Sequence, residues 1–215
     1  SMAGLWKCRR IVTSVEGDQG QADVAWRGLG GEGSLLGGGA SDYAKALESF
    51  QWRFVEPPLG TQNEYSFEGE TLKGVILDRG FEMESRILSG GKSSTSKILW
   101  NAGTPDVLSY ERDAGSNTNA IEVVVVQRKV ELPSDKGWGY DELYRITSSA
   151  GGIFGDSKVQ RAVRVKRRYR RALDQNGNRV VDGLEIMKTY RVLDGIAGVE
   201  MPTSTTKSQI QLTRI

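Results

Sequence analysis

The chain has 215 residues, a formal net charge of +2, 38% hydrophobic residues and 26% charged residues, which is the composition of a globular domain with a sizeable core. It contains no histidine and a single cysteine, Cys8, which excludes a Ser-His-Asp triad, a histidine-ligated metal and an internal disulfide. We therefore expect one domain over residues 4–215 that is a binding protein rather than an enzyme, with no catalytic residue and no metal site.

The sequence contains no clear signal for the location of the protein in the cell. No run of residues approaches the ~18 consecutive apolar positions of a membrane-spanning helix. Ser1 and Met2 resemble the remnant of a protease site in front of a trimmed domain, so we set residues 1–3 apart. A targeting segment would precede that remnant, and composition alone predicts no localisation.

The first quarter of the chain predicts strands and a glycine-rich loop. Residues 4–15 alternate as in a strand, with Cys8 as a small core residue, and residues 22–26 predict a second, short strand. Seven glycines lie between residues 28 and 39 and predict a loop near one mouth of the fold. Residues 43–49 predict a short helix.

The middle of the chain is dominated by short alternating segments. Residues 72–88 predict two strands, because apolar and charged residues alternate from position 81 to position 87. Glu82 and Glu84 would then share one charged face of a strand. Residues 120–132 have the strongest β propensity and are apolar on both faces, which predicts a central strand.

The second half predicts a long hairpin. Residues 133–140 are expected to form a loop with Trp138 near its tip, and residues 174–178 predict a tight turn. Further strands are expected over residues 50–55, 63–68, 97–101, 107–112, 142–148, 179–193 and 208–215. About ten to twelve short strands with at most one or two short helices predict an all-β, antiparallel barrel or sandwich, and the long hairpin favours a barrel.

The segment from Lys158 to Arg171 is the most unusual feature of the sequence. It holds eight lysines or arginines and no acid, so the rest of the chain carries 2 − 8 = −6 charges. As a strand it has one mixed face, with Val159, Arg161, Val163, Val165, Arg167, Tyr169 and Arg171. The other face is mainly cationic, with Gln160, Ala162, Arg164, Lys166, Arg168 and Arg170.

Each face of this basic strand suggests a different role. Inside a barrel, Arg161, Arg167, Tyr169 and Arg171 would bind the anionic end of an amphipathic small molecule. Alternatively, an internal acid neutralises them, the candidates being Glu82, Glu84, Glu122 and Glu185. On the outside, Arg164, Lys166, Arg168 and Arg170 would bind an acidic partner or an anionic membrane surface.

The start and the end of the chain resemble a known class of barrels. Gly4-Leu5-Trp6 resembles the G-x-W of the lipocalin and fatty-acid-binding barrels, together called calycins. There the tryptophan packs at the closed end under a basic residue from a late strand, and the resemblance assigns these roles to Trp6 and Arg214. Arg167-x-Tyr169 resembles the R-x-Y carboxylate anchor of fatty-acid-binding proteins.

Over most of its length the chain is similar to a lipocalin-like family of plants, algae and cyanobacteria, related to the phycobilin lyases. The segments that carry this resemblance are residues 5–8, 50–54, 97–100 and 140–144. It implies a chloroplast protein, stromal or thylakoid-associated, with a calycin-like barrel and a cavity for a pigment or lipid. The S-E-R-x-W-F stretch of the lyases has no counterpart, and the basic strand is its nearest analogue.

These observations leave three functions open. The first is a non-enzymatic carrier of an amphipathic anionic molecule, namely a tetrapyrrole, a carotenoid-derived acid or a lipid. The second is an assembly or scaffold factor for a photosynthetic complex, using residues 158–171 on an acidic partner. The third is chromophore handling similar to that of a bilin lyase. Nucleic acid is not an expected partner, because no pair of stacking aromatics lies on one exposed face.

Overall fold

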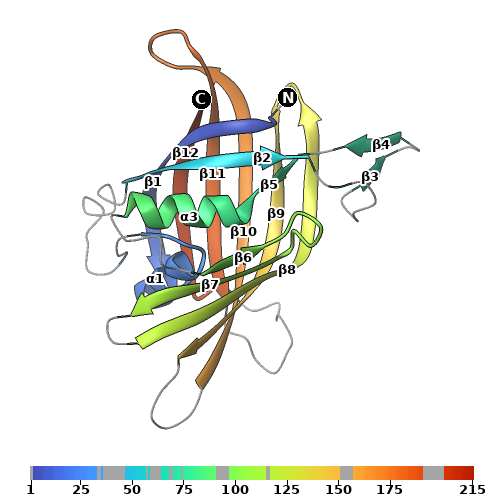
Figure 1. The fold of residues 1–215 in the computed structure, drawn as a ribbon. Coiled ribbons are helices and arrows are strands. Elements are labelled where there is room, and N and C mark those ends of the chain that lie inside the picture. Colours follow the sequence, from blue (N-terminus) through green and yellow to red (C-terminus); the bar gives the residue numbers. More distant parts are fainter. Residues whose placement is uncertain are drawn as a thin grey trace.

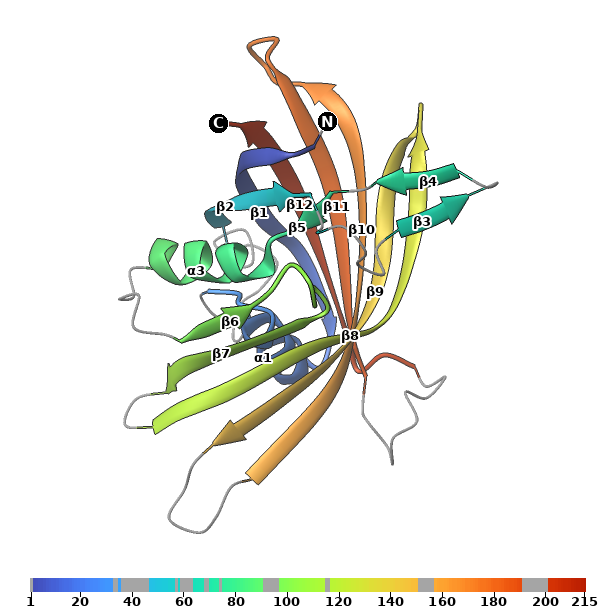
Figure 2. The same ribbon diagram turned by 45° about the vertical axis from the view of Figure 1, so that its right-hand side comes forward.

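The computed structural model describes residues 2–32, 35, 47–56, 58, 64–67, 70–73, 75–90, 97–114, 117–150, 157–190 and 201–215. Ten of its strands form one sheet: β1 (Gly4–Gly17), β2 (Leu47–Val55), β5 (Ile76–Leu77), β6 (Ile98–Trp100), β7 (Val107–Ala114), β8 (Asn117–Ser134), β9 (Gly137–Ala150), β10 (Ser157–Leu173), β11 (Arg179–Tyr190) and β12 (Ser204–Arg214). Two more strands, β3 (Glu64–Phe67) and β4 (Glu70–Lys73), form a separate hairpin that stands off from the sheet (Figure 2).

The large sheet is strongly curled, and its antiparallel strands follow the order β5-β2-β1-β12-β11-β10-β9-β8-β7-β6 (Figure 1). The strands from β6 to β12 are neighbours in sequence order, and β1 pairs with both β2 and β12. This up-and-down order gives a calycin-like barrel. The predicted all-β, antiparallel fold class is confirmed, including its small helical content.

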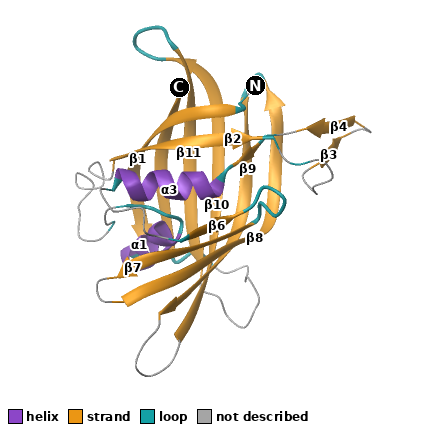
Figure 3. Cartoon of the chain, in the orientation of Figure 1, coloured by secondary structure: helices purple, strands orange, loops and turns teal. Residues whose placement is uncertain are grey.

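Among the described residues, two helices complete the barrel: α1 (Gln19–Gly28) and α3 (Arg79–Ser89). Helix α3 lies across the space between β2 and β6 (Figure 3), and the edge strands of the sheet, β5 and β6, are not hydrogen-bonded to each other. The backbone N–H of Gln51 on β2 donates to Ser85 Oγ on α3 at 2.7 Å. The helix therefore closes the seam of the barrel in place of a strand.

Both helices correct expectations from the sequence. The strand expected over residues 22–26 is part of α1, and the strand expected over residues 81–87 is part of α3. Asp18 and Asp78 cap the two helices, accepting from the backbone N–H groups of Gln21 and Phe81. The buried face of α3 holds the charged residues Glu82 and Arg86 beside Met83 and Ile87, so the alternation of apolar and charged residues misled the prediction.

Other boundaries differ from the expected ones by smaller amounts. Of the helix expected over residues 43–49, positions 47–49 belong to β2 and the rest lies outside the described residues. Trp138 lies within β9, and the turn of that hairpin is at Asp135 and Lys136. In the glycine-rich segment, Gly28 ends α1, residues 29 and 30 form a turn, and residues 31, 32 and 35 are the other described residues.

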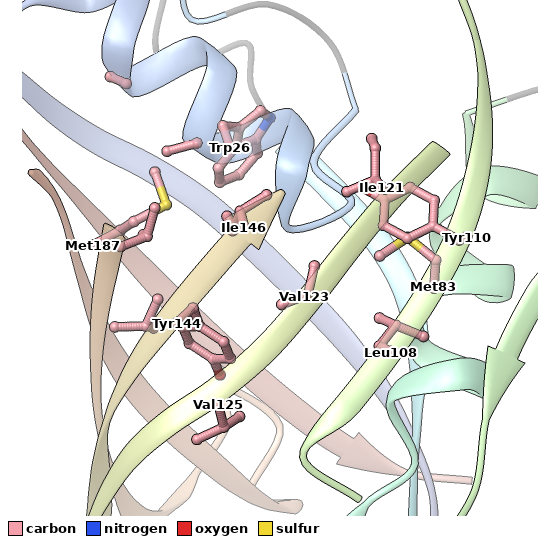
Figure 4. Packing of buried hydrophobic residues seen from close by; sticks show 14 of the residues in the cluster. Trp26, Met83, Leu108, Tyr110, Ile121, Val123, Val125, Tyr144, Ile146 and Met187 are labelled. Atoms are coloured by element: carbon pink, nitrogen blue, oxygen red, sulfur yellow. The ribbon is translucent and has the colours of Figure 1, made fainter. Parts of the chain in front are cut away.

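The two ends of the barrel are filled by different hydrophobic clusters. At one end, Trp26 of α1 packs with Met83, Tyr110, Ile146 and Met187 (Figure 4). The other end is aromatic and contains Trp6, Phe50, Trp52 and Tyr169. Arg214 lies over the ring of Trp6, with its guanidinium carbon 5.9 Å from the ring centre, in the arrangement that the calycin resemblance implied.

Candidate functional site: the two faces of the basic strand

Strand β10 is paired on both sides, with β9 and β11, so the direction of its side chains is fixed. Its inward face holds side chains that are each 6% exposed or less, namely Val163, Val165, Arg167 and Tyr169. Its outward face holds the exposed side chains Arg164, Lys166, Arg168 and Arg170. The two faces are those that the sequence separated, and the tertiary structure determines which one is inside.

Arg167 is the only arginine of β10 buried in the barrel. Its Nε donates to Glu185 Oε2 and its Nη1 donates to the Tyr140 hydroxyl, both at 2.5 Å. Its guanidinium carbon lies 5.2 Å from the ring centre of Trp52. Burial would lower the pKa of Arg167, but Tyr140 and Glu185 outweigh that effect and raise it. Arg167 therefore remains charged and is bound by the protein itself.

Glu185 also belongs to a larger set of buried charges. It accepts from Arg10 Nη1 at 3.2 Å, and Arg10 binds Glu48 as well. Arg86 Nη2 lies 3.2 Å from Glu48 Oε2. Arg86 Nη1 lies 3.6 Å from Oε1 of Glu82, which is four residues earlier in α3. We call this set the central charge network: Arg10, Glu48, Glu82, Arg86, Arg167 and Glu185. Its three cations and three anions come from β1, β2, α3, β10 and β11, so it ties the seam helix to the β2 side of the barrel wall.

The acids of this network respond differently to burial. Burial raises the pKa of Glu185, but Arg167 and Arg10 more than offset it and lower the pKa below its usual range. For Glu48, burial outweighs Arg10 and the hydrogen bond from the Glu32 backbone, so the pKa is raised. Since Glu185 is the acid shared by Arg10 and Arg167, it is the anion that holds these two arginines in the barrel.

A second buried carboxylate lies on β9. Glu142 Oε1 is 2.7 Å from Arg79 Nη2 and 2.6 Å from Arg128 Nε, and Glu142 also accepts from the Tyr144 hydroxyl. Burial opposes its ionisation, but Arg79 and Arg128 lower the pKa of Glu142 to about 2. Arg79 is the first residue of α3, so this acid fastens the seam helix to the barrel wall.

The four residues predicted to bind an anion are not brought together. Arg167 and Tyr169 are buried, whereas Arg171 is exposed and Arg161 is half-buried. Ten residues of a strand separate Arg161 from Arg171, a distance of roughly 33 Å. Tyr169 lies in the aromatic end of the barrel, 5.9 Å from Trp138 between ring centres. A single ligand does not contact all four side chains in this arrangement.

On the outward face, three of the four predicted partner-binding cations form exposed ion pairs across the strands. The pairs are Arg164 with Asp141 at 2.7 Å, Arg168 with Glu131, and Arg170 with Asp182 at 3.9 Å. Lys166 has no ion-pair partner among the described residues. This face is therefore partly self-neutralised, in contrast to the fully enclosed pairs of the inward face.

Two more cations lie near Arg164 on the neighbouring strands. Lys188 of β11 is the register partner of Arg164, and Arg145 of β9 is the register partner of Ala162. Within the described part of the chain, neither Lys188 nor Arg145 has an ion-pair partner. Arg164 and Lys166 thus have cations without an ion pair close by, whereas Arg168 and Arg170 are each paired with an acid.

Two open grooves run along the exposed side of α3, away from the basic strand. One has a volume of about 570 Å³ between α3 and β6 and is lined by Ile87, Ile98, Trp100 and Arg53 among others. The other, of about 460 Å³, lies between α3 and β2. Both include Glu84, which is exposed, while Glu82 is buried. The expectation that these two glutamates share one face is therefore wrong, because a helix separates them.

Comparison with known proteins assigns the chain to a family. The family model described as "Domain of unknown function (DUF6816)" matches residues 1–215. The chain belongs to this family. No curated protein and no solved structure matches the chain. The family description states no activity, so the geometry above is the basis for assigning one.

In this member of the family, some residues of the charge network had a signal in the sequence. Arg10 alternates with Cys8 and Val12 on the inward face of β1, so its burial follows from the strand pattern. Glu185 was one of the four acids considered for neutralising the inward arginines, and it pairs with Arg167. The pairs that Arg10 forms had no local signal, since Glu48 lies 38 residues away and Glu185 lies 175 residues away. In the described ranges no cluster of three or more potential metal ligands is found. Neither described helix is long and apolar enough to span a membrane.

Proposed function

We propose that the protein is a non-enzymatic docking factor that binds an acidic partner through the outward face of β10 and its neighbours. The observation that carries this proposal is the contrast between the two faces. The inward arginines of the central charge network are matched by buried glutamates, whereas the outward face keeps unpaired cations at Arg145, Lys166 and Lys188. The barrel then serves as a rigid platform for that face.

Energetics disfavour Arg167 as the anchor of a ligand carboxylate. A ligand anion would have to displace Glu185, which would leave that carboxylate buried without its partner. Breaking a buried pair in this way costs about 3–5 kcal/mol. The carrier function cannot rest on Arg167 unless ligand binding offsets a cost of that size.

Replacing the ion-pair partner of an arginine on the outward face is much less costly. Exposed ion pairs contribute about 0–1 kcal/mol, so Arg164 and Arg168 can leave Asp141 and Glu131 for the acids of a partner. Lys166 needs no such exchange. The setting that we propose, from the resemblance to the lipocalin-like family, is the chloroplast, with a component of a photosynthetic complex as the partner.

A second candidate function is binding of an amphipathic small molecule, such as a tetrapyrrole, a carotenoid-derived acid or a lipid. The observation that favours it is the groove of about 570 Å³ between α3 and β6, which falls in the size range of ligand sites. Trp100, Ile98 and Ile87 would contact the apolar body of the ligand. In this version the ligand binds at the seam and not inside the barrel.

Fluorescence anisotropy with a labelled oligoglutamate tests the docking proposal. We expect binding that weakens with salt, and the change Lys166→Glu should weaken it about tenfold. The matched control is Lys97→Glu, an exposed lysine beside β6 that makes the same change in net charge. If both variants weaken binding equally, only net charge matters and the proposed face is wrong. Native mass spectrometry with tetrapyrroles, carotenoids and fatty acids tests the second candidate.

A further inference from the structure

The unpaired cations of the outer wall lie among exposed apolar side chains. The register from β7 to β11 places Val107 opposite Val124, Val124 opposite Arg145, and Ala162 opposite Tyr190. Val126, at the bulge of β8, is 50% exposed and Val107 is 40% exposed. We call this region the mixed patch, formed by the cations Arg145, Arg164, Lys166 and Lys188 and the apolar or aromatic side chains Val107, Val124, Val126, Leu143 and Tyr190.

The mixed patch has both kinds of contact that a protein interface uses. Tyr190 lies close to Arg164, whose pKa is raised by its hydrogen bond to Asp141 and also by Tyr190. Tyrosine and arginine are the residues most often found at the energetic centre of interfaces. Acids also border the patch: Asp141 is the register partner of Lys166, Lys166 helps to lower the pKa of Glu131 on β8, and Glu122 is exposed two residues before Val124. The four cations of the patch outnumber these acids, so the patch is net positive and partly apolar.

From this arrangement we infer that the partner is an acidic protein that presents an amphipathic helix to the mixed patch. The five strands from β7 to β11 cover four inter-strand spacings, or roughly 19 Å. A helix of about 13 residues laid across the strands has that length. Its apolar side chains would contact Val107, Val126 and Tyr190, and its carboxylates would bind Arg145, Lys166 and Lys188. The inference rests on the proposed docking function and specifies its partner.

A protein fits the patch better than a bilayer does. The valines lie on a strand face among longer arginine and lysine side chains, so a partner's side chains can reach them. Insertion into a membrane requires apolar groups that project beyond their polar neighbours. The valines of this patch do not have that reach.

Two probe peptides with the same composition test the inference by anisotropy. One is a helix-forming peptide of leucine, alanine and glutamate with its leucines on one face, and the other has the same residues in scrambled order. We expect the amphipathic peptide to bind about tenfold more tightly. The double variant Val107→Ser, Val126→Ser should remove that preference and leave binding of the scrambled peptide unchanged. Circular dichroism verifies that the variant is folded.

A matched pair of cation variants locates the site. Lys188→Gln removes an unpaired charge of the patch, and we expect about fivefold weaker binding of the amphipathic peptide. Arg170→Gln removes a charge already paired with Asp182, and we expect little change. Equal losses from the two variants would overturn the inference.

The remaining outcomes separate the inference from the proposed function. If neither peptide binds, the docking function itself fails. If both bind equally well and Lys166→Glu weakens both, docking stands but the amphipathic partner is wrong. Vesicles of phosphatidylglycerol are the third probe, and binding to vesicles without binding to the amphipathic peptide would replace the protein partner with a membrane.

Discussion

The two faces of β10 use the same residue type for opposite purposes. Inside, Arg167 contacts Glu185, Tyr140 and Trp52 and is removed from water. Two positions back along the chain, Val165 is equally buried, whereas Lys166 between them is exposed. Inward charges therefore bind elements of the fold to one another, whereas outward charges are exposed to solvent. The inward and outward cations of β10 differ only in how deeply they are buried and in which acidic side chain lies nearest to them.

The largest expected effect concerns the inward face. Glu185→Ala leaves Arg10 and Arg167 buried without the acid they share, and we expect a loss of about 3–5 kcal/mol in the free energy of unfolding. Urea denaturation followed by circular dichroism measures it. The matched control is Glu131→Ala, which removes the exposed partner of Arg168 and should cost at most about 1 kcal/mol. Similar losses from the two variants would erase the distinction between the faces.

Acid denaturation sharpens the comparison through Glu142. Its pKa is about 2 in the folded protein, below the ordinary value of 4.5. A group whose pKa is depressed by folding stabilises the protein above the ordinary pKa, and that contribution is lost as pH falls from about 4.5 to about 2. The difference corresponds to about 3 kcal/mol. Urea titrations between pH 6 and pH 2 should show this loss, and in Glu142→Gln the dependence on pH should become shallower over that range.

A smaller change in stability is expected at a buried hydroxyl group that has no hydrogen-bond partner. Thr206 of β12 is buried, and among the described residues its hydroxyl has no hydrogen-bond partner. Thr206→Val keeps the shape and removes the unsatisfied group, so we expect a gain of about 1 kcal/mol in stability. Thr205→Val, at the half-exposed next position, is the control and should change little. Destabilisation by Thr206→Val would indicate a buried water at this hydroxyl.

Several features of the fold followed from the sequence because they depend on local geometry. The alternation of residues 158–171 assigned Arg167 and Lys166 to opposite faces, and the turn at residues 174–178 set the hairpin. In that turn the Asp174 carboxylate accepts from the backbone of Asn178, and Gly177 has φ +78. The same local patterns misassigned α3, since positions 81–87 alternate as a strand would, while the helix buries the charged residues Glu82 and Arg86.

Local patterns in the sequence are enough to predict an antiparallel β-sheet protein with one very basic strand. Periodicity and turn residues act over a few positions, and a single chain displays them directly. The three-dimensional structure was needed to show that Arg167 is neutralised by Glu185, that Arg10 joins them from the other end of the chain, and that Arg145, Lys166 and Lys188 have no ion-pair partner among the described residues. Those pairings depend on strand register and on the closure of the barrel. A shift of one residue in β10 would exchange its inner and outer charges.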